Sequence, residues 1–280
     1  MLRICVGKLE FMLTFSRLGK LGALGNQLFQ YCALKGISNK IDSDWKIPKT
    51  STFYYGLLDC FELKNIKQTN FIENEKFSTI KEKSFSFDSS LFDIKDDYDL
   101  VGYFQSEKYF KHIEQEIRDD LTFKKSFGEN FLRDYIFLHV RRTDYLKLPN
   151  HHPVCTKEYY EKALKYFPND IQVRIYSDDI DWCKKNFIGD RFIICDDQEY
   201  YDGEVLNVGI QEMEKLLMPY KDLYEMSNCK GAIIANSSFS WWGAWLINDK
   251  KFPIVSPTNW FGKSKPVNTK DLIPKEWIKI

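Results

Sequence analysis

Short apolar runs alternate with helically spaced apolar positions along the chain, a pattern typical of α/β proteins. In the first half, residues 10–16 predict a strand, residues 19–25 a turn with three glycines, and residues 26–37 a helix with apolar side chains at i, i+4 spacing. A strand, a glycine turn and a helix in this order predict the start of a parallel βαβ unit.

The second half shows the same alternation more clearly. Runs of apolar and β-branched residues predict strands, and amphipathic stretches between them predict helices. Pro219 is expected to open a helix, because its fixed φ and missing N–H suit the first helical position. The predicted strands are 135–140, 173–176, 192–195, 232–235 and 252–255, and the predicted helices are 157–167, 180–186, 219–228 and 237–246.

Strands that alternate with helices predict a parallel sheet covered on both faces. Two such units, one in each half, would form two Rossmann-like, doubly wound α/β domains that face a central cleft. We place the first domain at residues 1–127 and the second at 128–280, with the junction near 124–128. Residues 40–125 are rich in Lys, Asp, Phe and Ser and lack a clean period, so no elements are predicted there.

Composition narrows the class of protein. The chain has 280 residues, of which 44% are apolar and 16% aromatic, enough for a sizeable core. Lys and Arg together number 40, as do Asp and Glu, so the formal net charge is zero. The chain therefore lacks the excess of basic residues that is typical of nucleic-acid-binding proteins. Aromatic residues are interleaved with the charged ones throughout, which excludes a disordered chain.

Cysteine usage and hydropathy bear on the compartment. The seven cysteines form no C-x-x-C pair, so we expect reduced thiols rather than a disulfide framework or a zinc site. No apolar run approaches the roughly 20 residues that span a bilayer. Residues 1–10 lack the long apolar stretch of a signal peptide, and Met12 is an alternative start to Met1. We therefore expect a cytoplasmic protein.

Candidate chemistry lies where predicted strands end, because ligands of open parallel sheets bind beyond the carboxyl ends of strands. The first candidate is Gly25-Asn26-Gln27 at a helix start. Free backbone N–H groups and the helix dipole favour an anion there. A glycine turn before a helix is also common as a purely structural feature.

The second candidate, His139-Val-Arg141-Arg142-Thr-Asp144-Tyr, directly follows an apolar strand. His139 and Arg141 share one face of extended chain, and Arg142 takes the other. The planar fork of Arg141 suits a diphosphate. We expect Arg142 to pair with Asp144 or a neighbouring carboxylate, although Asp144 is also a conceivable base. The alternative is a structural ion-pair cluster.

The third candidate is Tyr176-Ser-Asp178-Asp179, at the end of another predicted strand. The Asp178 carboxylate could accept hydrogen bonds from a ribose hydroxyl or from the N1 and N2 donors of guanine. Either aspartate could instead cap the following helix, and for Asp179 we expect the cap.

The fourth candidate runs from Ala235 to Trp245 and contains a serine cluster at a predicted helix start. Ser237, Ser238 and the backbone N–H groups could bind a phosphate. Phe239 could line a base or sugar pocket. Core packing would explain the tryptophans of this segment but not its serines, so we assign Trp241 and Trp245 to the core.

A metal site is not predicted. The D-x-D triplets Asp42–Asp44 and Asp97–Asp99 lie in acidic segments without periodicity, and neither follows a convincing strand. His151 and His152 are adjacent, a spacing that rarely chelates. No G-x-x-x-x-G-K-[ST] loop, G-x-S-x-G elbow or G-x-G-x-x-G dinucleotide motif is present, which disfavours NTPases, α/β-hydrolases and nicotinamide-dependent oxidoreductases.

Together these segments resemble the α-1,2-fucosyltransferases of glycosyltransferase family eleven. The resemblance is found in Gly-Asn-Gln-Leu-Phe-Gln-Tyr (25–31), His-Val-Arg-Arg-Thr-Asp-Tyr (139–145), Tyr-Ser-Asp-Asp (176–179), Asn-Ser-Ser-Phe-Ser-Trp-Trp-Gly-Ala-Trp (236–245) and the closing Asp-Leu-Ile-Pro-Lys-Glu-Trp-Ile (271–278). It covers nearly the whole chain and is weakest over residues 40–125. Ala23 stands where the family usually has glycine.

The resemblance implies a GT-B fold and metal-independent, inverting transfer of L-fucose from GDP-fucose to the 2-hydroxyl of a galactoside. No cofactor would be needed. The acceptor would be a galactose-containing oligosaccharide or a lipid-linked glycan, which would bring the enzyme to the inner face of the plasma membrane. Arg141 would hold the β-phosphate and act in catalysis. The other donor-binding residues implied are Asn26, His139, Asp178, Ser237, Ser238 and Phe239.

Two other functions remain open on the sequence. The His-Val-Arg-Arg-Thr-Asp segment occurs more widely, so α-1,6 or protein O-fucosyl transfer is an alternative, although Ser-Ser-Phe-Ser-Trp-Trp favours the α-1,2 group. The second alternative is a non-catalytic module that binds sugar nucleotides or glycans. GDP binding without transfer would distinguish it.

Overall fold

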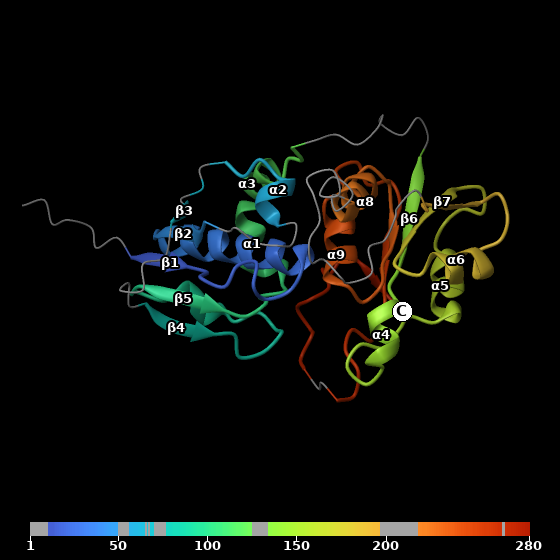
Figure 1. Cartoon of the computed structure of the whole chain (residues 1–280). Coiled ribbons are helices and arrows are strands. Elements are labelled where there is room, and N and C mark those ends of the chain that lie inside the picture. Colours follow the sequence, from blue (N-terminus) through green and yellow to red (C-terminus); the bar gives the residue numbers. More distant parts are fainter. Residues whose placement is uncertain are drawn as a thin grey trace, which may run out of the picture.

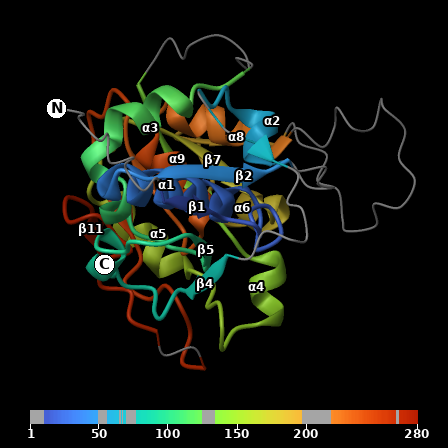
Figure 2. The same cartoon turned by 90° about the vertical axis from the view of Figure 1, so that its left-hand side faces the viewer.

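The computed structural model describes residues 11–49, 56–64, 66, 68–69, 77–124, 134–196, 218–264 and 267–280. Within them the chain forms two parallel α/β units, which lie side by side in Figure 1. Figure 2 looks along the line that joins the units, with the first unit nearer the viewer. The two Rossmann-like units predicted from the sequence are therefore confirmed.

The first unit is built on a five-stranded sheet of order β3-β2-β1-β5-β4, in which every pairing is parallel. A parallel sheet needs a crossover between neighbouring strands, and α1 makes the crossover from β1 to β2. The elements are β1 Met12–Thr14, α1 Leu24–Ile41, β2 Asp44–Pro48, α2 Leu57–Cys60, β3 Gln68–Thr69, β4 Ser78–Lys81, η1 Ser89–Phe92, β5 Tyr98–Val101, η2 Glu107–Tyr109, η3 Lys111–Ile113 and α3 Glu114–Asp120.

The second unit has a six-stranded sheet of order β11-β10-β9-β6-β7-β8, also parallel throughout. Apolar side chains of β6 alternate between its two faces. Ile136 and Leu138 pack toward α5 and α6, whereas Phe137 packs toward α8 and α9. The elements are β6 Tyr135–Val140, α4 Thr143–Lys147, α5 Lys157–Leu164, β7 Gln172–Ser177, α6 Ile180–Asn186, β8 Phe192–Ile194, α8 Met218–Ser227, β9 Ala232–Ile233, α9 Ser238–Trp245, β10 Ile254–Ser256 and β11 Ile278–Lys279.

The elements of the second half agree with the sequence prediction to within a few residues, apart from the unpredicted α4 and β11. The strands of residues 40–125 were missed for a physical reason. They are two to five residues long, and β4 exposes three of its four residues, so no alternating apolar pattern marks them. The junction predicted near residues 124–128 falls largely outside the described residues and stays a prediction.

Helix α1 is buried on nearly all sides, because it packs against the first sheet and also against α9 of the second unit. The turn before it places Gly22 at φ +88°, where a side chain would be strained. Ala23 has φ −78° in extended backbone, which any residue can adopt. The glycine usual in the family at this position is thus not needed for the turn.

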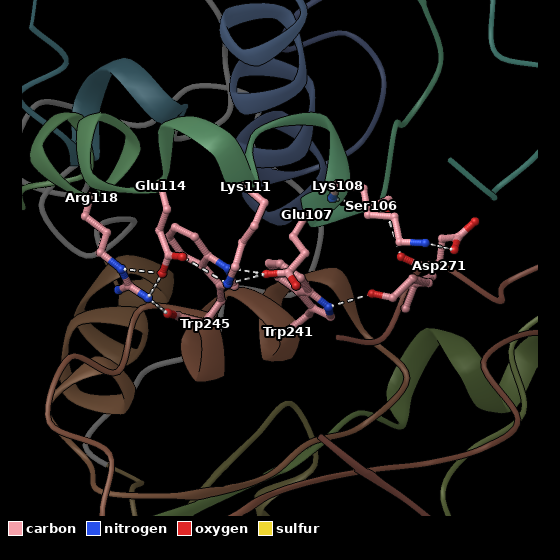
Figure 3. Close-up of polar contacts among 10 residues, drawn as sticks. Ser106, Glu107, Lys108, Lys111, Glu114, Arg118, Trp241, Trp245 and Asp271 are labelled. Atoms are coloured by element: carbon pink, nitrogen blue, oxygen red, sulfur yellow. Dashed lines mark hydrogen bonds and ion pairs between the residues drawn. The ribbon is translucent and has the colours of Figure 1, made fainter. Parts of the chain in front are cut away.

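Polar and aromatic contacts join the two units (Figure 3). The Arg118 guanidinium of α3 lies 4.2 Å from the ring of Trp245 in α9 and donates to the Trp245 carbonyl at 3.0 Å. Glu107 of η2 accepts from the Trp245 indole N–H at 3.2 Å. Lys108 pairs with Asp271 at 2.5 Å, which attaches the C-terminal segment to η2. Trp241 and Trp245 are buried, as predicted.

The described cysteines form no disulfides, and the described helices are too short or too polar to cross a bilayer. Six cysteines lie among the described residues, and all six are buried and free of disulfides. Cys5 and the predicted features of residues 1–10 lie outside the described residues. Of the helices described, none combines the length and apolar character needed to cross a bilayer.

Candidate functional site

The site lies where three neighbouring strands of the second sheet end. Strands β9, β6 and β7 are adjacent and parallel, so the residues that follow them meet at one edge. Arg141 follows β6, Asp178 follows β7, and Ser237 comes shortly after β9. The sheet order therefore brings together three of the four segments that the sequence singled out.

Arg141 is held by two carboxylates. Its guanidinium lies 2.8 Å from the Asp144 carboxylate and 3.2 Å from that of Asp178, and about a third of the side chain is exposed. Burial alone would lower the pKa of Arg141, but Asp178 and Asp144 raise it overall. The arginine is thus a fixed, permanent cation at the carboxyl edge of the sheet.

Of the two partners expected for Arg142, Asp144 is wrong, and a neighbouring carboxylate, Asp179, is confirmed. Because α4 begins at Thr143, one turn of chain brings Asp144 beside Arg141. Arg142 points the other way, pairs with Asp179 at 2.9 Å and lies 4.3 Å from the ring of Trp182. The Asp144 carboxylate therefore holds Arg141, the arginine that faces the site.

Asp178 fixes the loop that carries Arg141. One oxygen accepts from the Arg142 N–H at 2.8 Å, and the other accepts from the N–H and hydroxyl of Thr143 at 3.1 and 2.5 Å. With the ion pair to Arg141, these contacts occupy most of the carboxylate, so its predicted contact with guanine stays a prediction. Asp179 accepts from the Trp182 N–H at 3.1 Å and caps α6, as expected.

His139 lies on the face of β6 that α9 covers. Its ring is 5.8 Å from that of Phe239, and only 7% of the residue is exposed. Burial, together with the nearby charge of Arg141, lowers the pKa of His139 to about 3. Its Nδ1 has no hydrogen-bond partner among the described residues. A neutral imidazole with an unused ring nitrogen can bond a polar ligand.

Helix α9 begins at the site without a side-chain cap. Ser237 occupies the N-cap position in extended backbone, yet its hydroxyl makes no capping bond. Ser240 instead accepts from the Ala235 N–H at 3.0 Å and secures the turn between β9 and α9. The first N–H groups of α9 and the hydroxyls of Ser237 and Ser238 are therefore placed to bind an anion.

Helix α1 of the first unit also begins here. A Cβ added at Gly25 would lie 2.5 Å from the Phe239 backbone nitrogen and 2.8 Å from the Ser238 hydroxyl oxygen, so only glycine permits this approach. No side chain caps α1 at Ala23. Two helix N-termini thus converge from the two units, which concentrates positive potential at one place. The sequence predicted each helix start separately but not their convergence.

A pocket opens between the units beside these helix starts. Its volume is about 480 Å³, including its open mouth. Asn26 lies at its edge, where its side-chain oxygen accepts from the Gln105 amide at 2.7 Å. The lining residues are Asn26, Phe85, Tyr103, Gln105, Tyr145, His152, Asn236, Ser238, Trp260 and Phe261.

Sequence analysis found Asn26 and Ser238 of this lining but missed the residues that follow β4 and β5. Phe85, Tyr103 and Gln105 sit beyond the carboxyl ends of those strands, the position at which ligand-binding residues are expected. The position of these residues could not be predicted, because β4 and β5 carry no apolar pattern that marks them as strands.

The two D-x-D triplets lie around the starts of β2 and β5. Asp44 starts β2, and Asp97 and Asp99 flank the start of β5. Asp97 accepts from the Met12 N–H, and Asp99 accepts from the Ser16 N–H and hydroxyl. Among the residues described, no three His, Cys, Asp or Glu side chains gather as metal ligands would.

Two parallel α/β units whose strands end at a shared pocket have the architecture of a GT-B glycosyltransferase. The chain belongs to glycosyl transferase family 11, whose family model matches residues 17–280. The resemblance seen in the sequence is therefore confirmed.

Curated relatives agree with this family. An "Alpha-1,2-colitosyltransferase" of Escherichia coli is 31% identical over 92% of this chain and 96% of its own length. The "O-antigen biosynthesis glycosyltransferase WbnK" of Escherichia coli is 29% identical over 92% of this chain and 98% of its own. The crystal structure of the fucosyltransferase NodZ from Bradyrhizobium is 15% identical, covers 84% of this chain and 93% of its own, and superposes with a TM-score of 0.48.

Proposed function

We propose that this glycosyltransferase moves L-fucose from GDP-fucose to the 2-hydroxyl of a galactoside, with inversion and without a metal ion. One observation carries the proposal. Arg141 is held by two carboxylates and lies 5.5 Å from the ring of Tyr145, which lines the same pocket as Asn26 and Ser238 at the starts of α1 and α9. A diphosphate is the part of a sugar nucleotide that fits the arginine fork and the free N–H groups of the two helix starts.

The mechanism follows from where charge develops. As the bond between the sugar C1 and the diphosphate oxygen breaks, the sugar gains oxocarbenium character and GDP gains negative charge. Arg141 and the N–H groups of the two helix starts stabilise that charge without reorganising. The acceptor oxygen attacks C1 from the face opposite GDP, which inverts the configuration, and its proton passes to water.

The remaining donor contacts follow from this placement. Asn26, Ser237 and Ser238 would bond the diphosphate or the sugar, since all three lie at the helix starts. His139, neutral and with Nδ1 unused, would bond the nucleotide, and Phe239 would lie against the same part of the donor. We assign Asp178 chiefly to holding Arg141, and its contact with guanine would use the one acceptor position that its other partners leave.

A second donor deserves equal testing. The 31% identity to a protein named as a colitosyltransferase extends over nearly the whole chain. Colitose is fucose without its 3-hydroxyl, so a diphosphate site of the kind described above would serve both nucleotide sugars. Discrimination would come from the contacts around C3 alone, which a comparison of GDP-fucose with GDP-colitose measures directly.

The test is transfer from each nucleotide sugar to a panel of β-galactosides in the presence of EDTA, with the linkage determined by NMR. Arg141→Ala is expected to lower kcat by a factor on the order of 10². Arg141→Lys keeps the charge but loses the fork, so it should recover part of the rate. Arg191→Ala, at the amino end of β8, is the control.

Four results would contradict the proposal. Near wild-type turnover of folded Arg141→Ala would remove the arginine from catalysis. Loss of transfer in EDTA, restored by a divalent ion, would refute metal independence. GDP binding without transfer to any acceptor in the panel would favour a non-catalytic module, and a different linkage in the product would favour α-1,6 or O-fucosyl transfer.

A further inference from the structure

Five aromatic rings form a continuous line along the pocket between the units, which we call the aromatic wall. Phe85 and Tyr103 come from the first unit, and Phe261, His152 and Tyr145 come from the second. Successive ring centroids are 5.7, 4.8, 5.7 and 4.8 Å apart in the order Tyr103, Phe85, Phe261, His152, Tyr145. The line ends beneath Arg141, whose guanidinium lies 5.5 Å from the Tyr145 ring.

Hydrogen bonds from side chains to the backbone hold the first-unit end of this wall. Glu82 accepts from the backbone N–H groups of both Tyr103 and Phe104, at 2.7 and 2.9 Å. Phe104 adopts φ +51°, a conformation costly for a large side chain. Gln30 donates to the Gly102 carbonyl at 3.1 Å. A strained loop that is held from two sides indicates that the position of Tyr103 matters.

The second-unit end is held in the same manner. The Gly262 N–H donates to the His151 carbonyl at 2.9 Å, which ties Phe261 to His152. The Tyr145 hydroxyl donates to the Asn236 carbonyl at 3.1 Å, and the Asn236 amide donates to the Trp260 carbonyl at 3.0 Å. The rings are thus arranged before any ligand arrives.

An unused polar atom lies in the same pocket. Gln105 is 6% exposed, and its amide nitrogen donates to Asn26. Its carbonyl oxygen Oε1 has no hydrogen-bond partner among the described residues. A buried acceptor without a donor is costly, so its presence at a pocket points to a ligand hydroxyl.

A pyranose ring has an apolar C–H face and a rim of hydroxyl groups. The aromatic faces of the wall suit the C–H face, and the buried Gln105 carbonyl oxygen can accept a hydrogen bond from one of the hydroxyl groups. We propose that the aromatic wall and Gln105 bind the acceptor sugar. This inference rests on the function proposed above. The diphosphate belongs at the helix starts, where Asn26 and Ser238 border the pocket, so a sugar on the wall lies beside the donor rather than in its place.

The decisive experiment compares the KM for methyl β-galactoside with that for the nucleotide sugar in Tyr103→Ala and Phe261→Ala. Loss of one stacking face should raise the acceptor KM about tenfold, with the donor KM and the Kd for GDP unchanged. Tyr103→Phe keeps the ring face and should stay near wild type. Tyr166→Ala is the matched control, because Tyr166 is 43% exposed and lies beyond α5, away from the pocket.

Slow hydrolysis of the nucleotide sugar without acceptor separates the possible outcomes. Hydrolysis that stays at the wild-type rate in Tyr103→Ala, with a raised acceptor KM, is the expected result. A fall in hydrolysis together with a raised donor KM would assign the wall to the donor sugar and overturn the proposal. An unchanged acceptor KM in both folded alanine variants would overturn it as well.

Failure of the proposed function gives a different pattern. If the wild-type protein neither binds GDP nor transfers sugar, the donor assignment is refuted, but the role of the aromatic wall is not yet tested. Saturation-transfer NMR with methyl β-galactoside alone then tests the wall directly, since the signal should be equal for wild type and Tyr166→Ala and several-fold weaker for Tyr103→Ala. Equal signals from all three proteins would refute the inference.

Discussion

The contact between the starts of α1 and α9 allows a sharp test through Gly25→Ala. The added Cβ would lie 2.5 Å from the Phe239 backbone nitrogen, and ordinary contact begins at 3.4 Å, so the two helix starts must separate by about 0.9 Å. The atom met is backbone, so no side chain can rotate away. The substitution therefore displaces the site rather than a single contact.

Two energies oppose each other in folding. Overpacking of this kind costs about 1–3 kcal/mol. Replacing glycine by alanine within a helix raises the free energy of unfolding by about 1 kcal/mol, because alanine has the higher helix propensity. The net loss in the free energy of unfolding should thus be at most about 2 kcal/mol, which leaves the protein folded. Catalysis should suffer more, because a misplacement of about 1 Å can reduce the rate about 10²-fold.

Gly36→Ala is the matched control. It lies in the same helix, about 16 Å further along, and its Cβ would meet the Tyr109 carbonyl oxygen at 2.1 Å. Its stability loss should equal or exceed that of Gly25→Ala, yet kcat/KM should remain within a few-fold of wild type. The assay is transfer kinetics at a temperature where denaturant unfolding shows all proteins folded. If Gly25→Ala keeps full activity, or if both variants lose activity equally, the convergence of the helix starts is not what positions the donor.

Two further predictions concern stability. Because the pKa of His139 is lowered to about 3 when folded and is ordinarily 6.5, the unfolded state takes up the proton first as pH falls, and stability is lost below about pH 6.5. His139→Gln should flatten this dependence by about 1 kcal/mol between pH 6.5 and 5.5, measured by urea unfolding at both values, and an unchanged slope would contradict a buried neutral imidazole. Arg118→Ala removes the stacking on Trp245 and the hydrogen bond to its carbonyl, so it should lower the unfolding free energy by about 1–3 kcal/mol. An unchanged denaturation midpoint would show that this contact adds nothing to the joining of the units.

Local chemistry explains what could be predicted. Strand β6 and helix α9 were recognised because burial imposes an apolar pattern within a few residues. The cap at Asp179 follows from a carboxylate placed before a helix. Arg141 could be singled out because it follows a buried strand of a parallel sheet, where ligands bind.

The partners of Arg141 show where prediction from the sequence ended. Asp144 lies three residues after Arg141 and two after Arg142, and which of them it pairs with depends on the residue at which α4 starts. Asp178 was a candidate guanine contact, but the register of β6 beside β7 sets its carboxylate against the Arg142 and Thr143 N–H groups. Such contacts depend on strand order and register, which no local pattern encodes.

The sequence by itself determined the class of fold, the strand ends that supply the site, the family and the core position of the tryptophans. The tertiary structure alone decided the convergence of α1 with α9 and the assembly of the aromatic wall from four separate segments. The reason is physical. The periodicity of a helix or strand depends on residues that are close together in the sequence. A pocket between two units depends on packing between residues that are far apart in the sequence.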